Sequence, residues 1–168
     1  MTIELDHDKY SAYLNQHLVA ADAGVQAFKA AADTWAGTQW EATFRQLHEE
    51  LSDSHELVKQ LIERLGYHVS AVRHIVAGVA AAAGRINPIN LTRNNDGLMT
   101  QSELDALAAA VTAQLMMWET LLVLCEIDGR LDRDECQSMI ERCTDQRRRV
   151  MEVSMATTLQ RFTKQPEA

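Results

Sequence analysis

Apolar residues recur at steps of three and four along four long segments of this chain, and this feature limits the possible fold most strongly. Such spacing places them on one face of an α-helix, and that face must be buried against another element. The 168 residues include only two prolines and seven glycines, which is typical of helical proteins. We therefore predict an all-α chain whose length fits one domain with its own core.

The first two segments form a predicted helical hairpin. One helix should run from about residue 8 to 33 and the next from about 39 to 65. Gly37 breaks the pattern between them, and Gly66 follows the second helix as a C-cap. Because the connection is short, the two helices should lie antiparallel.

The last two segments form a second predicted hairpin, with helices from about 101 to 127 and from about 132 to 163. Each helix should begin with a capping box, in which an N-cap side chain is followed by a Glu three residues later. The two boxes are Thr100 with Glu103 and Asp132 with Glu135.

A long connection separates the hairpins. An Ala-rich stretch from about 69 to 84 predicts one short helix, and the irregular stretch RINPINLTRNNDGLMT follows it. Two hairpins joined in this way predict a ferritin-like antiparallel four-helix bundle with an additional short crossover helix.

Two parts of the chain carry a resemblance to known families. FRQLHEELSDSHELVKQLIERLG, from Phe44 to Gly66, resembles the second helix of the YciF/YciE-like branch of the ferritin-like superfamily. YLNQHL and ELDALAAAVTAQLMMWETL are similar to uncharacterised helical-bundle proteins of actinobacteria. The resemblance consists of helical pattern, so it implies a fold and carries no established activity.

The di-iron site of ferritin-like proteins is not expected here. That site needs a Glu from each of two helices and a Glu-x-x-His from each of the other two. Glu4 and His7 form such a pair only at the extreme N-terminus, and Thr144 stands where a His would have to follow Glu141. The acidic residues of the second helix, Glu49, Glu50 and Asp53, lie off its apolar stripe and are predicted to be solvated. We therefore predict neither a catalytic site nor a cofactor.

Three histidines are the candidate ligand site. His17 falls on the stripe of the first helix, while His48 and His55 flank the stripe of the second. His17 and His55 stand almost equally far from Gly37, so the hairpin should place them at one height. Such a pair could bind a transition metal ion, bind a ligand carboxylate, or be two core histidines, and the sequence leaves these alternatives open.

Arg147 interrupts the stripe of the last helix, which the sequence suggests is Cys136, Ile140, Cys143, Arg147 and Val150. A buried guanidinium needs a carboxylate partner or a bound anion. Glu119 and Asp22 are the candidate partners by their helical positions, so we predict a buried ion pair. An anion site or a dimer seam at this part of the helix would also account for Arg147.

A calcium site is a rival interpretation of both Gly-containing turns. Asp96-Gly97 with Glu103, and Asp128-Gly129 with Glu135, match half of an EF-hand loop. The first ligand position holds Thr92 in one loop and Leu124 in the other, and Leu124 cannot coordinate calcium. Helix capping explains both matches, so we expect calcium to have no effect.

Charge and cysteine content suggest where and how the protein acts. The net charge of −8 argues against binding to nucleic acid or to anionic membranes. Three cysteines without metal-ligand spacing predict buried thiols in a reducing compartment, and the N-terminus has neither a signal peptide nor a membrane anchor pattern. We therefore expect a cytoplasmic protein.

The functional expectation is a non-catalytic binding or interaction module for an unknown ligand. The alternative is a metal-binding protein or metalloenzyme with a non-standard histidine site. Apolar residues beside the main stripes, Met117, Leu121 and Met139, predict association through helix faces, most simply as a homodimer.

Overall fold

The computed structural model describes residues 4–70 and 97–164, and these form four helices without any strand. The helices are α1 (His7–Thr34), α2 (Glu41–Arg64), α4 (Gly97–Leu124) and α5 (Arg133–Phe162). The all-α prediction is therefore confirmed, with helix boundaries within a few residues of those expected.

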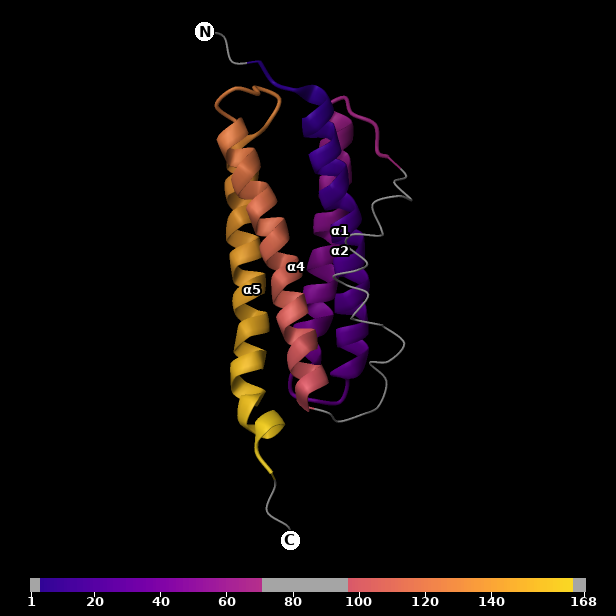
Figure 1. Ribbon diagram of the computed structural model, residues 1–168, viewed down its shortest axis with the longest axis vertical. Coiled ribbons are helices and arrows are strands. Elements are labelled where there is room, and N and C mark those ends of the chain that lie inside the picture. The colour runs from indigo at the N-terminus through magenta and orange to yellow at the C-terminus, as the bar shows by residue number, and fades with distance from the viewer. Residues whose placement is uncertain (1–3, 71–96, 165–168) are drawn as a thin grey trace.

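The four helices form one bundle made of two antiparallel hairpins (Figure 1). α1 packs on α2, α4 packs on α5, and α1 also contacts α4. α2 ends at the end of the bundle opposite to the one where α4 begins, so α2 and α4 run in the same direction. Of the helix predicted from 69 to 84, Val69 and Ser70 are not helical, and the remainder lies outside the described residues.

Buried positions repeat every seven residues in the helices, alternately three and four residues apart. This is the pattern of helices that pack at about +20° with coiled-coil-like interdigitation of side chains. In α2 the repeat comprises Phe44, Leu47, Leu51, Ser54, Val58 and Leu61. In α5 it comprises Cys136, Met139, Cys143, Gln146, Val150, Val153 and Thr157.

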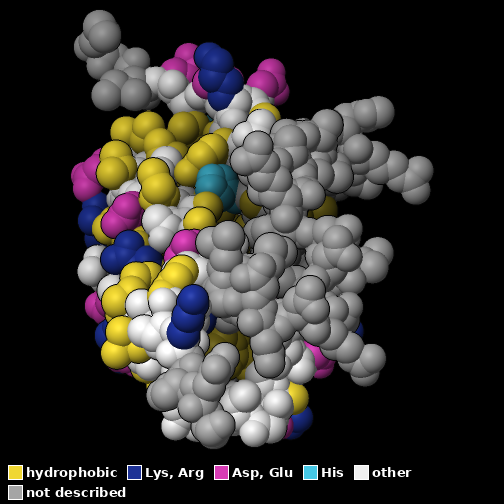
Figure 2. All heavy atoms as spheres, turned by 60° about the horizontal axis from the view of Figure 1, so that its bottom comes forward, with side chains coloured by type: hydrophobic (Ala, Val, Ile, Leu, Met, Phe, Trp, Pro, Cys, Tyr) yellow, Lys and Arg dark blue, Asp and Glu magenta, His cyan; other side chains and the backbone are white. Residues whose placement is uncertain are grey.

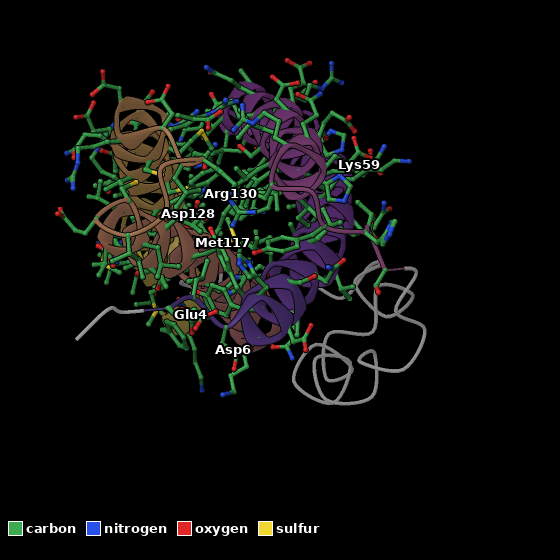
Figure 3. The ribbon with its side chains drawn as sticks, turned by 90° about the horizontal axis from the view of Figure 1, so that it is seen from above. Glu4, Asp6, Lys59, Met117, Asp128 and Arg130 are labelled. Atoms are coloured by element: carbon green, nitrogen blue, oxygen red, sulfur yellow. The ribbon has the colours of Figure 1, made fainter. Side chains whose placement is uncertain are left out.

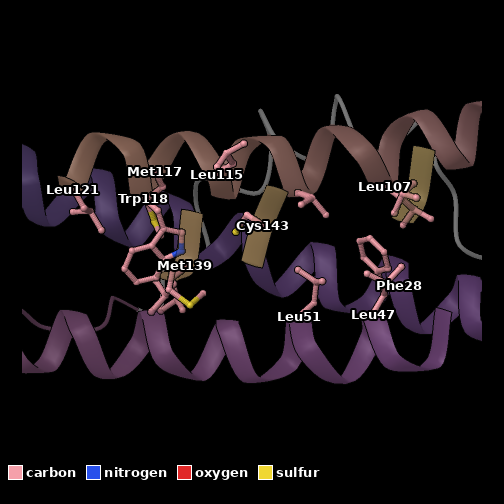
Figure 4. Packing of buried hydrophobic residues seen from close by; sticks show 14 of the residues in the cluster. Phe28, Leu47, Leu51, Leu107, Leu115, Met117, Trp118, Leu121, Met139 and Cys143 are labelled. Carbon is pink, nitrogen blue, oxygen red and sulfur yellow. The ribbon is translucent and has the colours of Figure 1, made fainter. Parts of the chain in front are cut away.

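The apolar core runs along the bundle (Figure 4). Phe28, Leu47 and Leu107 meet at one level, and Trp118 packs beside Met139 at another. These side chains are less than 5% exposed. Each such side chain contributes roughly 1.5–3 kcal/mol through removal from water, so the core alone can hold the hairpins together.

The predicted partner surface is wrong in its residues. Met117, Leu121 and Met139 are 1%, 0% and 4% exposed and belong to the core. Met117 and Leu121 are buried because α4 contacts both α5 and α1, and Met139 is buried because it occupies a position of the seven-residue repeat of α5. Exposed apolar side chains lie elsewhere, chiefly along the second half of α5, and Figure 2 shows hydrophobic patches on the side that α4 and α5 form. The α5 residues are Met151, Met155, Leu159 and Phe162.

Capping chemistry sets most helix ends as expected. Asp132 accepts hydrogen bonds from the backbone N–H groups of Asp134 and Glu135, at 2.9 and 3.2 Å, and so caps α5. Gly37 and Gly66 follow α1 and α2 with φ of 76° and 77°, values that favour glycine. The expected cap at Thr100 is wrong, because α4 already begins at Gly97 and Thr100 lies inside it.

Arg130, in the turn between α4 and α5, ties the two hairpins together at one end of the bundle, seen from above in Figure 3. Arg130 donates to both carboxylate oxygens of Asp128 at 2.8 Å, to the carbonyl of Leu65 at 2.7 Å and to the Tyr67 hydroxyl at 3.2 Å. Asp128 is buried, and bonding to Arg130 lowers the pKa of its carboxyl despite that burial. Both carboxylate oxygens of Asp128, a residue of the rival calcium-loop interpretation, thus bond to Arg130.

α4 is also the one described helix whose length and composition would allow it to cross a membrane, over Thr100–Leu124. Within the 18-residue apolar window of this stretch, 44% is buried inside the bundle. Its buried side chains, such as Leu107, Val111 and Trp118, pack against the neighbouring helices. Such burial is what the core helix of a bundle requires.

Candidate functional site

A cavity of about 380 Å³ lies between α1 and α4, with α2 contributing part of its wall. Small side chains create it, because alanines and a glycine occupy the facing positions of the two helices. A Cβ atom on Gly24 would lie 3.9 Å from the Cβ of Ala110, so the two backbones run close together at that point. The lining residues from α1 and α4 include Ala20, Ala21, Ala23, Gly24, Ala27, Ala106, Ala109, Ala110 and Ala113.

Larger apolar side chains complete the wall. Leu51 and Val58 come from α2, and Met117 comes from α4. Leu51 and Val58 stand seven residues apart at repeat positions of α2, so both point toward the bundle interior. The cavity is therefore a mostly apolar space with walls from three helices.

His17 is one of two polar side chains among the described lining residues. It is half-buried, and this burial lowers the pKa of its imidazole below 6.5, so the ring is neutral at pH 7. Its ring meets the edge of Tyr13 with centroids 4.6 Å apart. A neutral imidazole offers one hydrogen-bond donor and one acceptor.

Gln114 is the other polar lining residue, and the sequence analysis missed it. Its side chain is 6% exposed, and its amide nitrogen, Nε2, has no hydrogen-bond partner among the described residues. Buried amides are usually paired, because leaving such a donor unsatisfied costs about 1–3 kcal/mol. The signal was present in the sequence, since Gln114 stands midway between Leu107 and Leu121 in the seven-residue repeat.

A buried polar layer crosses the bundle at the height of Gln114. Gln114 lies 11 residues before Cys125, and Gln146 lies 10 residues after Cys136, while the two cysteine sulfurs are 4.0 Å apart. In antiparallel helices this places both glutamine side chains within about one residue, or roughly 1.5 Å, of the same height. Gln146 is fully buried and donates to the Glu50 carboxylate at 3.1 Å, and Ser54 is buried one turn along α2 from Glu50.

The three predicted histidines are not brought together as a ligand set. Across residues 4–70 and 97–164, no three His, Cys, Asp or Glu side chains gather closely enough to hold a metal ion. His48 and His55 are half-buried on α2, and neither lines the cavity. The pKa of His17 is lowered by burial and not by a second imidazole.

The predicted buried ion pair is wrong. Arg147, Glu119 and Asp22 are all exposed in the structure. The assumed stripe of α5 stepped from Cys143 by four residues, whereas the helix steps by three and buries Gln146 instead. That difference of one position turns Arg147 out to solvent.

Arg149, two residues after Arg147, makes the ion pair that the helix does bury in part. It bonds to Glu50, one of the acidic residues expected to be solvated, while Arg142 donates to the Glu50 carbonyl at 3.0 Å. Burial raises the pKa of Glu50, but the bonds from Arg149 and Gln146 outweigh this and lower it. These contacts join α2 to α5 on the side of the bundle away from the cavity.

Glu103 is a second buried carboxyl, and its expected role in a capping box is wrong because the helix begins earlier. It is 5% exposed, and its Oε1 atom has no partner among the described residues. Burial raises the pKa of Glu103 to about 7. It stands seven residues before Ala110, on the face of α4 that carries the alanines of the cavity.

The three thiols are free. Cys136 and Cys143 are buried as predicted, and Cys125 is half-buried. Burial raises the pKa of the Cys136 and Cys143 thiols to about 12. Both therefore remain protonated at neutral pH and behave as small core residues.

No protein-family model, no curated protein and no solved structure matches this chain.

Proposed function

We propose that this chain is a non-catalytic binding module and that the cavity between α1 and α4 holds a small, mostly apolar molecule. The single observation that carries the proposal is the cavity itself, of about 380 Å³ and lined almost entirely by apolar side chains. Binding sites for small molecules are typically about 300–1,000 Å³, mostly apolar, and supplied with a few polar groups that orient the ligand. His17 and Gln114 are such groups.

Binding suits this lining better than catalysis. His17 is the one titratable side chain among the described lining residues, and its ring contacts the ring of Tyr13. General acid–base work by a histidine normally uses a second polar group that orients the ring. Tyr13 meets the ring by its aromatic edge, and its hydroxyl donates to Thr120 at 3.3 Å, so it does not provide that orientation.

Filling the cavity tests this function. The variant Ala110→Leu places a larger side chain among the cavity residues, and it should weaken binding of the neutral fluorescent probe 1-aminoanthracene at least tenfold. Ala21→Leu fills the same space from α1, so the pair guards against a folding defect in one variant. Ala42→Leu, at an exposed position of α2, is the matched control and should bind as the wild type does. Equal binding by all four proteins, or none by the wild type, would contradict the proposal.

The finer description of the fold is also proposed. Two antiparallel hairpins, with α2 and α4 running in the same direction, support a ferritin-like bundle with one long crossover connection. The free thiols at Cys125, Cys136 and Cys143 support a cytoplasmic location, where thiols stay reduced.

We propose a homodimer as the assembled state, with the exposed apolar stripe of α5 as its contact. Along the outer face of this helix, polar Glu141, Thr144 and Arg148 give way to apolar side chains from Met151 to Phe162. A stripe confined to one half of a helix suits a two-fold contact, in which the same residues of both copies face one another.

A further inference from the structure

Gln114 stands out among the buried polar groups because it combines three properties. It lines the cavity, it is more than nine-tenths buried, and its amide nitrogen has no partner in the described part of the chain. A buried donor without a partner is destabilising unless some other molecule supplies an acceptor. Because the Nε2 atom itself has almost no accessible surface, the amide meets an acceptor in the cavity by turning about its Cγ–Cδ bond.

Two buried glutamines, Gln114 and Gln146, lie at this height of the bundle, and they differ in their hydrogen-bond partners and in their access to the cavity. The Gln146 amide nitrogen already donates to Glu50, whose carboxylate Arg149 also binds. Gln146 is fully buried and does not line the cavity, although it lies at the same height as Gln114. Of the two glutamines in this layer, Gln114 alone can reach a molecule in the cavity.

The lining also indicates the charge of the ligand. None of the described lining side chains is an Asp, Glu, Lys or Arg. His17 is neutral at pH 7, since burial lowers the pKa of its imidazole. A charged ligand would lose its hydration without gaining an ionic partner, which is strongly unfavourable in an apolar site.

We propose that the ligand of this cavity is an uncharged, mostly apolar molecule that carries a hydrogen-bond acceptor, and that the Gln114 amide donates to this acceptor. This inference rests on the proposed function and adds the chemical class of the ligand to it. The apolar body of the ligand contacts the alanine methyl groups together with Leu51 and Val58. Its carbonyl, ether or ring-nitrogen acceptor lies toward Gln114.

Two probes of the same shape isolate the hydrogen bond. Naphthalene and quinoline differ by one ring nitrogen, which is an acceptor and is uncharged at pH 7.5. Their affinities are measured by displacement of 1-aminoanthracene from the wild type and from Gln114→Met, a change that keeps the length of the side chain and removes the amide. The ratio of quinoline affinity to naphthalene affinity should fall about tenfold in this variant.

Gln146→Met is the matched control, since it makes the same change at the same height outside the cavity, and its ratio should equal that of the wild type. The charged analogues N-methylquinolinium and 2-naphthoate should bind the wild type at least tenfold more weakly than quinoline.

The outcomes separate this inference from the function on which it rests. If naphthalene and quinoline bind and their ratio is the same in wild type and Gln114→Met, the assignment of Gln114 is overturned while the binding function stands. Binding of either ion as tightly as quinoline would overturn the uncharged class. If no probe binds the wild type, the proposed function itself fails.

Discussion

Glu103 shows how a single residue departs from the rules that its sequence context suggests. Its position three residues after a threonine favours a capping box, yet the helix starts earlier, so the carboxyl belongs to the interior of α4 and is buried. Burial then raises the pKa of Glu103 to about 7 from the usual 4.5. The folded protein consequently holds this proton more tightly than the unfolded chain does.

The sign of the pH effect follows from this shift. Below pH 4.5 the carboxyl is protonated in both states, so it adds no pH dependence. As the pH rises from 4.5 through 7, the unfolded chain ionises first, and the free energy of unfolding falls. Glu103→Gln removes this ionisation. The free energy of unfolding of the variant minus that of the wild type should therefore rise by on the order of 2–3 kcal/mol from pH 4 to pH 8.

Urea denaturation at pH 4, 6 and 8 measures this difference. Glu119→Gln is the control, because Glu119 is exposed on the same helix. A gap between Glu103→Gln and wild type that stays constant from pH 4 to 8 would show that the Glu103 carboxyl is not held in its protonated form.

The candidate site was predictable in part at the residue scale. His17 was found because a histidine interrupting an apolar stripe is conspicuous. Gln114 and the alanines were missed, since a polar residue at one repeat position and small residues at several others leave a helical pattern almost unchanged. A cavity forms where the side chains of two facing helices are both too small to fill the space between them. The sequence of one helix does not reveal which residues of the other helix lie at the same height.

At the scale of the helix, the seven-residue repeat explains both the successes and the errors of sequence reasoning. Cys136, Cys143 and Val150 occur in the expected stripe and in the observed one. Which residues between them are buried depends on whether the helix steps by three or by four. A step of three from Cys143 buries Gln146 and leaves Arg147 exposed. Helix ends were predicted well where a cap is present in the sequence, as at Asp132 and Gly66, and less well at the start of α4.

The α5 cap gives a prediction at this scale. Asp132→Ala removes the acceptor of two backbone N–H groups and should lower the free energy of unfolding by about 1 kcal/mol. Asp134→Ala, in the same turn of the helix, removes only a favourable charge near the helix N-terminus and should cost a few tenths of a kcal/mol. Thermal and urea denaturation of the two variants would show whether Asp132 acts as the cap, and equal losses would argue against this role.

At the scale of the whole molecule, the side chains that fill each hairpin differ in size from those at the contact between the two hairpins. Large side chains fill each hairpin, whereas the seam between α1 and α4 is made of small ones and contains the cavity. Pairing within each hairpin was predictable from short connections. The seam was not, because residues distant in sequence form it and no local pattern specifies their contact.

The proposed homodimer gives a prediction at this scale. Light scattering should give about twice the mass of the 18.8 kDa chain at high protein concentration. Leu159→Ser and Met155→Ser each remove an exposed apolar side chain from the α5 stripe, so they should weaken the dimer without lowering thermal stability of the chain. Met116→Ser is the control, because Met116 is also an exposed apolar residue but lies on α4, outside the α5 stripe. A wild-type monomer at every concentration would disprove the assembly.

The seven-residue repeat also limits how such a chain can vary in length. On a straight helix a seven-residue stripe drifts by about 20° per repeat, so the four helices stay in contact only by winding around one another with a left-handed twist. One residue inserted between Ala110 and Gln114 would turn the amide about 100° away from the alanines behind it. Insertions within the helices are therefore tolerated only as seven residues at a time, with the same insertion at the same height of each neighbouring helix. The turn at Gly37 lies outside the repeat, so it can lengthen without this restriction.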